Sequence, residues 1–299
     1  MAGSGNMQDI KRRVRSVTSI EHITNAMKLV SAAKLRRAKL MLEKTQRYFK
    51  YVTDAIREVL ANTEDVPTTY LSGDREIKKT CYIVVTSNRG LAGSFSANVI
   101  KQTLLAMQER DSEAVIVSVG SKGRDYFRRR NYEMASEHLL PPENITFVET
   151  REISKPILEQ FEQGEIDEVV LVYTSFISPL EQRAKQVRLL PFEIDQNIEQ
   201  KEASAASSST KKEIRQVEYE PSAEAVFDYL IPKYVEIMFF GAIIESATCE
   251  HAARRVAMES ATDNAHDMIS DLNLTFNRAR QAAITREITE IVSGADALN

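Results

Sequence analysis

The residues of this 299-residue chain that could do chemistry gather in one turn, "SNRGLAGSFS". An apolar run rich in β-branched residues ends just before this turn, and a helical pattern follows it. Glycines between a strand and a helix can let backbone N–H groups converge on a phosphate, to which Arg89 could add a charge. However, Ser94 stands where a P-loop places its lysine, and the turn lacks the third glycine of a Rossmann motif. A second strand–glycine–helix pattern, "VGSKGRDYF", favours plain structural turns at both places. We therefore expect no nucleotide cofactor, and keep a nucleotide-dependent enzyme that uses the turn from Arg89 to Ser94 as the alternative.

Other reactive side chains are scattered. The cysteines, Cys81 and Cys249, stand far apart, which argues against a disulfide framework and suits a reducing compartment. None of the four histidines forms a His-x-x-x-His pair, so a zinc or iron site is not expected. We expect no catalytic residue, no metal and no cofactor. No apolar run reaches the length of a bilayer span, and the N-terminus lacks the hydrophobic region of a signal peptide.

Two segments at the ends of the chain have helical periodicity. Residues 7–61 contain neither proline nor glycine, and their apolar seam is expected at Ile10, Val14, Val17, Ile20, Ile23, Met27, Val30 and Ala33. Residues 221–296 form the second long helix, which Pro221 and Ser222 open and Pro232 is expected to break or kink. Its expected seam is Ala261, Ala265, Met268, Leu272, Thr275 and Ala279, continued by Ile284, Ile288 and Ile291. The first six residues are left out of this interpretation.

The segment between the helices changes its period. Short buried strands are predicted at "CYIVVT", "AVIVSVG" and "EVVLVYT", and the helices between them at "SANVIKQTLLAMQER", "KGRDYFRRR" and "SKPILEQFEQ". This alternation predicts a Rossmann-like α/β domain with a parallel sheet over residues 77–194. The stretch "VRLLPFEI" is expected to add an edge strand, since Pro191 would disrupt a central one. Residues 198–220, with "ASAASSSTKK", are predicted to be a polar loop and linker.

Charge is distributed unevenly between the two ends. Residues 1–60 hold 13 Lys/Arg against 5 Asp/Glu, whereas residues 233–299 hold 6 against 10. Opposite signs favour contact between the two ends. We therefore predict an α/β fold in which the long N- and C-terminal helices form an antiparallel coiled coil and the Rossmann-like domain is inserted between them. The basic N-terminal face leaves a nucleic-acid-binding coiled coil as a weaker alternative, because no aromatic residues interleave with its charges between Lys28 and Lys39.

The two termini also carry a family resemblance. The stretches "DIKRRVRSVTSIEHITNAMKLVSAAKLRRA" and "EHAARRVAMESATDNAHDMISDLNLTFNRARQAAITREITEIVSGADAL" resemble the gamma subunit of F-type ATP synthase. The central "SNRGLAGSFS" is similar to that family's usual S-D-R-G-L-C-G-G-L-N, from which it departs at Asn88, Ala92, Ser94, Phe95 and Ser96. The resemblance covers essentially the whole chain, although these departures leave it without a specific role for the turn.

The resemblance implies a mechanical part rather than an enzyme. A gamma subunit is the central rotor shaft, present once in each complex. It transmits torque between the ion-driven c-ring of the membrane sector and a ring of three alpha and three beta subunits, and the catalysis belongs to beta. The implied partners are therefore alpha, beta, epsilon and the c-ring, with no nucleic acid. The implied location is peripheral, at the cytoplasmic face of the bacterial plasma membrane. No cysteine pair matches the regulatory insertion of chloroplast members.

The resemblance also implies partner contacts. Met27, Arg254, Gln281 and Thr285 match positions that contact the acidic catch loop of beta. Met27 could instead be a seam residue, and Arg254 could pair with Glu250 or Glu259 on its own helix. The basic residues Lys34, Arg36, Arg37 and Lys39 suit an acidic stator, or a plain solvated helix face. The C-terminal stretch "ITREITEIVSGADAL" resembles the tip that turns in an apolar bearing.

Overall fold

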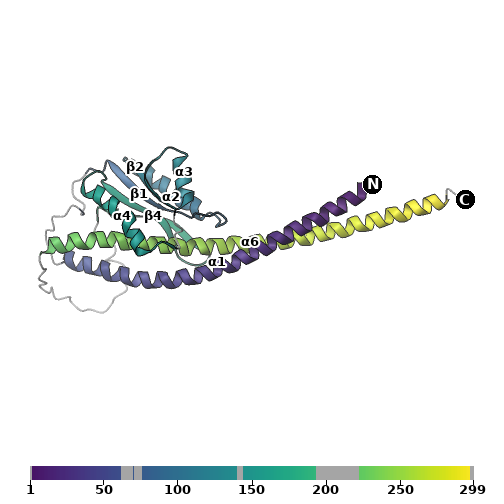
Figure 1. The fold of residues 1–299 in the computed structure, drawn as a ribbon, viewed down its shortest axis with the longest axis horizontal. Coiled ribbons are helices and arrows are strands. Elements are labelled where there is room, and N and C mark those ends of the chain that lie inside the picture. Colours follow the sequence, from purple (N-terminus) through teal and green to yellow (C-terminus); the bar gives the residue numbers. More distant parts are fainter. Residues whose placement is uncertain (1, 62–69, 71–75, 140–143, 193–221, 297–299) are drawn as a thin grey trace. The chain divides into compact units, whose positions relative to one another are not determined.

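Two long helices and one sheet make up the fold in the computed structural model (Figure 1), which describes residues 2–61, 70, 76–139, 144–192 and 222–296. Helix α1 spans Ala2–Ala61, and helix α6 spans Ala223–Asp296. The chain divides into two compact units, of which one comprises Met1–Ala33 with Arg254–Asn299 and the other Lys34–Ala253. The long terminal helices are confirmed, and α1 begins at Ala2, five residues before the expected start.

The larger unit contains a five-stranded sheet with the order β3-β2-β1-β4-β5. Its strands are β1 (Lys79–Val85), β2 (Glu113–Val119), β3 (Glu133–His138), β4 (Glu168–Phe176) and β5 (Gln182–Leu190). The first four are parallel, and β5 pairs antiparallel with β4 at the edge. This confirms the predicted parallel sheet and the expected edge strand. The connecting helices are α2 (Phe95–Gln108), α3 (Ser121–Arg128) and α4 (Phe147–Glu162).

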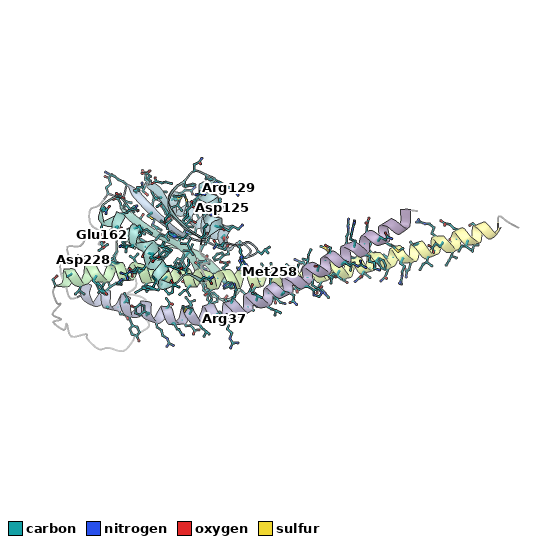
Figure 2. All side chains as sticks on the ribbon, viewed as in Figure 1. Arg37, Asp125, Arg129, Glu162, Asp228 and Met258 are labelled. Atoms are coloured by element: carbon teal, nitrogen blue, oxygen red, sulfur yellow. The ribbon has the colours of Figure 1, made fainter. Side chains whose placement is uncertain are left out.

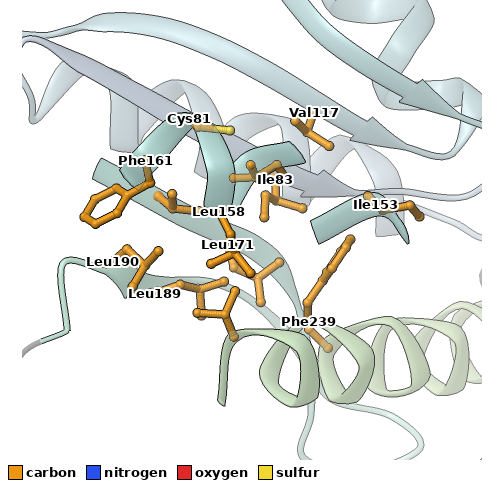
Figure 3. Close-up of a cluster of buried hydrophobic side chains, with 14 of the residues drawn as sticks. Cys81, Ile83, Val117, Ile153, Leu158, Phe161, Leu171, Leu189, Leu190 and Phe239 are labelled. Atoms are coloured by element: carbon orange, nitrogen blue, oxygen red, sulfur yellow. The ribbon is translucent and has the colours of Figure 1, made fainter. Parts of the chain in front are cut away.

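Both faces of the sheet are buried, which explains the almost uninterrupted apolar runs of β1, β2 and β4. Tyr82 and Val84 of β1 point into a cluster formed with α2 and α3. The alternate residues of β1 point into a larger cluster that also takes in α4 and α6. Figure 3 shows Phe239 of α6 approaching this cluster beside Leu171 of β4. Helix α6 therefore serves as one of the layers that cover the sheet.

One strand was missed, and two local expectations were wrong. Strand β3 was missed, because "EMASEH" has no β-branched residue and an edge strand is only partly buried. Helix α4 begins at Phe147 and not near Ser154, since Thr146 and Glu149 form a capping box there and Pro156 lies inside the helix.

Pro232 does not break α6, which continues through it. Its neighbours Ile231 and Val235 are fully buried in the larger cluster, and this packing offsets the backbone hydrogen bond that proline removes. Ser222 does cap the helix, because its Oγ accepts from the backbone N–H of Ala225 at 3.1 Å. The predicted loop at 198–220 lies outside the described residues.

Candidate functional site

The N–H groups that a phosphate would need at the start of α3 are already hydrogen-bonded within the chain. The partners all belong to the segment that follows β1: Ser121 N donates to Asn88 Oδ1 at 2.7 Å, Lys122 N to Ser87 O at 3.1 Å, and Gly123 N to Thr86 Oγ1 at 2.9 Å. Gly120 is required for a different reason. Its φ is 98°, and a Cβ there would lie 2.1 Å from the carbonyl oxygen of Thr86. The second glycine turn is thus a close crossing of two chain segments.

The first glycine turn is held together by its own side chains. Ser87 Oγ lies 2.7 Å from Ser96 Oγ and 2.9 Å from the carbonyl oxygen of Arg89. A Cβ on Gly90 or Gly93 would meet nothing within 4 Å, so neither glycine is needed for a close approach. Gly93 has a φ of 57°, which glycine adopts without strain. Its conformation accounts for that glycine.

Metal ligands and reactive thiols are the other groups that could do chemistry. Within it, no group of three or more His, Cys, Asp or Glu side chains could hold a metal ion. Both cysteines are buried, and burial raises the pKa of each thiol, to about 12 for Cys81. These thiols are therefore poor nucleophiles at neutral pH. Among the described helices, none is both long and apolar enough to cross a membrane.

The seam between α1 and α6 in the smaller unit follows a strict seven-residue spacing. On α1 it runs through Ile10, Val17, Thr24 and Ser31, and on α6 through Met258, Ala265, Leu272 and Ala279. Thr262 Oγ1 lies 2.8 Å from Thr24 Oγ1, and His266 Nδ1 lies 3.9 Å from Glu21 Oε1. These contacts establish an antiparallel pairing of α1 with α6. The numbers of two residues that lie opposite each other, one on each helix, add up to about 286.

Part of the expected seam was therefore wrong. Ile20, Ile23 and Val30 are exposed, Ile23 by 57%, whereas Thr24 and Ser31 are buried. Apolarity was the wrong guide, because a small hydroxyl side chain can be buried once it is hydrogen-bonded, as Thr24 is to the carbonyl oxygen of Glu21. The seven-residue spacing from Ile10 would have found these positions. On α6, Met268 and Thr275 are also exposed rather than in the seam.

Met27 lies at the border between the seam and the exposed face of α1. It is half-buried, with exposed Ile23 four residues before it and exposed Val30 three residues after it. This partial exposure is compatible with both interpretations of Met27.

The remaining catch-loop candidates lie along α6 without forming a cluster. Arg254 is half-buried, and its neighbour Arg255 lies 3.9 Å from the carboxylate of Glu259. Gln281 and Thr285 are exposed one turn apart, and Thr285 Oγ1 donates to the carbonyl oxygen of Gln281 at 3.0 Å. These two side chains present a single polar spot on the helix.

The basic residues proposed to face the stator do not share one environment. Lys34, Arg36 and Arg37 are exposed, and the side chain of Arg37 projects away from α6 in Figure 2. Lys39 is half-buried, and its Nζ lies 4.9 Å from the centre of the Phe176 ring at the end of β4. Lys39 therefore has a cation–π contact inside the larger unit.

Among the described residues, no other helix extends alongside the end of α6. The register of about 286 places Ala2, the start of α1, opposite Ile284. Ile284, Ile288, Ile291 and Val292 are all exposed, Ile291 by 72%. The expected continuation of the seam through these isoleucines is wrong for the chain by itself. Helix α1 begins at Ala2, opposite Ile284, so it does not extend alongside the later residues of α6.

Comparison with known proteins supplies the family. The family model described as ATP synthase matches residues 6–298. An ATP synthase gamma chain of Alkaliphilus metalliredigens is 48% identical over 292 residues, covering 98% of both chains. A gamma chain of Acetobacterium woodii, named as sodium ion specific, is 42% identical and is matched over 98% of this chain and 99% of its own length.

Solved structures agree on the fold. The central stalk and c-ring structure of the Tetrahymena thermophila mitochondrial ATP synthase contains a chain that is 25% identical, with a TM-score of 0.60 over 80% of this chain and 99% of that one. A chain of the Euglena gracilis mitochondrial ATP synthase is 18% identical, with a TM-score of 0.66 over 99% of this chain and 95% of that one. The long helices, the inserted sheet and the full-length sequence matches together show that this chain belongs to the gamma-chain family of ATP synthases.

Proposed function

We propose that this chain is a non-catalytic rotor that transmits torque between an ion-driven c-ring and the catalytic ring of alpha and beta subunits. As a gamma chain it is the central stalk of an ATP synthase, and its partners are the alpha, beta and epsilon subunits and the c-ring. It has no catalytic residue of its own, and it is peripheral to the cytoplasmic face of the bacterial plasma membrane. In physical terms, an asymmetric shaft favours a different conformation of each beta subunit at each angle.

The observation that carries this proposal is the bare end of α6. A helix that exposes Ile284, Ile288, Ile291 and Val292 after its partner helix has ended needs a surrounding surface to bury them. We propose that a sleeve formed by the alpha and beta subunits supplies that surface. Contact of Met27, Arg254, Gln281 and Thr285 with an acidic loop of beta remains a prediction, as does the stator-facing role of Lys34, Arg36, Arg37 and Lys39.

The nucleotide-enzyme alternative lacks support from the site. In the turn from Arg89 to Ser94, the conformation of Gly93 explains that glycine, and at the second glycine turn the N–H groups that open α3 are already hydrogen-bonded within the chain. Similarly, the α1 basic face offers no aromatic platform for nucleic acid between Lys28 and Lys39.

A reconstitution experiment tests the rotor. Purified chain alone is expected to bind neither ATP nor NAD in calorimetry at micromolar concentrations. Mixed with alpha and beta subunits, it is expected to form a complex in which a bead attached to the larger unit turns during ATP hydrolysis. Hydrolysis by the assembled complex with a stationary bead would contradict the proposal. Micromolar nucleotide binding that Gly93→Val abolishes would favour the enzyme instead.

A further inference from the structure

The sheet has a topological switch point between β1 and β4. From β1 the chain passes through α2 to β2 on one side, whereas β4 lies on the other side of β1 and is reached through α4. Helices α2 and α4 cover opposite faces of the sheet. In doubly wound α/β folds, ligands bind outside the carboxyl ends of the strands at this point.

In this chain, helix α6 occupies the carboxyl end of β4. The Oε1 atom of Glu245 accepts two hydrogen bonds of 2.8 Å, from Ser175 Oγ and from the backbone N–H of Phe176. One residue further along α6, Ser246 Oγ accepts from the backbone N–H of Thr174 at 3.3 Å. Successive residues at the end of the strand thus donate to successive residues of the helix.

The glycine turn after β1 completes the same contact. Ala92 and Phe95 are buried against Cys249 of α6, and Phe176 and Ala253 pack against this cluster. Cys249 Sγ also lies 3.5 Å from the carbonyl oxygen of Thr174. The turn that resembled a phosphate loop therefore has an apolar side, and that side packs against the helix.

We propose that α6 is the intramolecular ligand of this α/β domain, with the Glu245 carboxylate in the place of a ligand anion. The Ser175 hydroxyl and the Phe176 backbone N–H both donate to this carboxylate at the end of β4, as donors do in a small anion-binding site. Hydrogen bonds to a charged acceptor are about twice as strong as neutral ones. Glu245 is thus a positioning residue that fastens the domain to the helix at the edge where other folds of this kind bind small molecules.

This fastening also has a mechanical consequence, which rests on the proposed rotor function. Torque that passes between α6 and the α/β domain must cross their shared interface. The larger cluster around Phe239 is apolar and non-directional, so it resists separation more than sliding. The Glu245 hydrogen bonds are directional, and they fix the strand end against the helix.

Two substitutions in the assembled complex test the fastening. Hydrogen exchange of the peptide that contains Thr174–Phe176 is expected to be at least about tenfold faster in Glu245→Ala than in the unchanged protein. Glu245→Gln keeps a neutral acceptor, and should give a smaller increase. Glu259→Ala, which removes another glutamate of α6 from its pair with Arg255, serves as the matched control and should leave this peptide unchanged. Unchanged exchange in Glu245→Ala would overturn the fastening, and Glu245→Gln provides the same test if the alanine variant fails to assemble.

A second measurement separates the joint from the rotor function. ATP hydrolysis without load is expected to stay within about twofold in Glu245→Gln. ATP synthesis at a limiting ion gradient should fall severalfold, because a less rigid interface between α6 and the α/β domain transmits less torque. Faster exchange together with unchanged synthesis would overturn the mechanical role while leaving the fastening established. If the bead on the larger unit does not turn even in the unchanged complex, the rotor function itself has failed.

Discussion

Three glycines in two similar turns should respond very differently to alanine. At Gly90 a Cβ meets nothing within 4 Å and φ is not positive, so Gly90→Ala should be neutral or stabilise the domain by about 0.4–1 kcal/mol. At Gly93 the space is equally open, but φ is 57°, which costs an alanine roughly 1–2 kcal/mol.

Gly120→Ala should be by far the most damaging. Its φ of 98° lies in a region that is strained for any residue with a Cβ, at about 1–3 kcal/mol. The new Cβ would also lie 2.1 Å from the carbonyl oxygen and 2.7 Å from the carbonyl carbon of Thr86. Thr86 directly follows the central strand β1, and its N–H donates to the carbonyl oxygen of Val119 at 2.8 Å, so its backbone cannot move aside cheaply; overpacking adds roughly 1–3 kcal/mol. The expected loss is therefore about 2–6 kcal/mol, a large share of a typical domain's stability.

Hydrogen exchange of peptides from β1 and β2 measures these changes within the α/β domain, where a global melting curve would mix them with the long helices. The expected order of stability is Gly90→Ala, then Gly93→Ala, then Gly120→Ala, and ATP is expected to protect none of the three. Equal destabilisation by Gly90→Ala and Gly120→Ala would refute the steric reasoning. Protection by ATP that Gly90→Ala removes would show that the first turn holds a ligand.

Three further predictions concern the helices. Thr262→Val should destabilise the pairing with α1 by about 1 kcal/mol, because the buried Thr24 oxygen, which still donates to Glu21, loses the hydroxyl that donates to it; Thr24→Val in the same chain should restore most of this loss, exchange of the α1 peptides checks it, and an additive double variant would contradict it. Met27→Lys should slow ATP-driven rotation by about tenfold with little change in assembly, since an added ion pair with an acidic loop must break at each step; normal rotation would leave Met27 as a seam residue only. Deleting the residues from Gly294 onward should leave coupled hydrolysis nearly intact, whereas deleting 279–299 should lower the yield of complex; the reverse result in a truncation series would show that the bearing lies elsewhere.

The elements with strong periodicity were predictable from the sequence. The two long helices and the three buried strands stand out because almost every residue in them fits one pattern. Strand β3 did not, since a half-exposed edge strand needs few apolar residues. Pro232 and Pro156 also misled the prediction. Pro232 was expected to break or kink its helix and Pro156 to lie near the start of one, but both lie inside a helix, because tertiary packing outweighed the local preference of proline.

The pairing of the two long helices was predicted correctly, but part of the set of residues that lie in the seam was not. Thr24 and Ser31 occupy seam positions that a search for apolar residues passes over, and Ile20 and Ile23 lie outside. The fastening by Glu245 was beyond the sequence altogether. A glutamate in a long helix gives no local sign that a strand end some 70 residues earlier donates to it.

Two threonine hydroxyls at the end of α6 are satisfied by the helix itself. Thr285 Oγ1 donates to the carbonyl oxygen of Gln281 at 3.0 Å, and Thr289 Oγ1 donates to that of Thr285 at 2.8 Å. Each hydroxyl proton is therefore used within the helix, and only the oxygen remains to accept from a partner. The exposed side chains of Ile284, Ile288, Ile291 and Val292 can add apolar contacts, which have no preferred direction.

That division of contacts suits a surface that must slide. Residues 285–296 extend about 18 Å beyond the point where the register places the start of α1. A strong directional bond at that end would have to break and re-form at every step of a rotation, and each 1.4 kcal/mol of added barrier slows a step about tenfold. Apolar burial changes little with angle if the surrounding surface is also apolar. Under the proposed function, Glu245 makes directional hydrogen bonds where the α/β domain must not move, whereas Thr285 and Thr289 direct their protons into their own helix at the end that must turn.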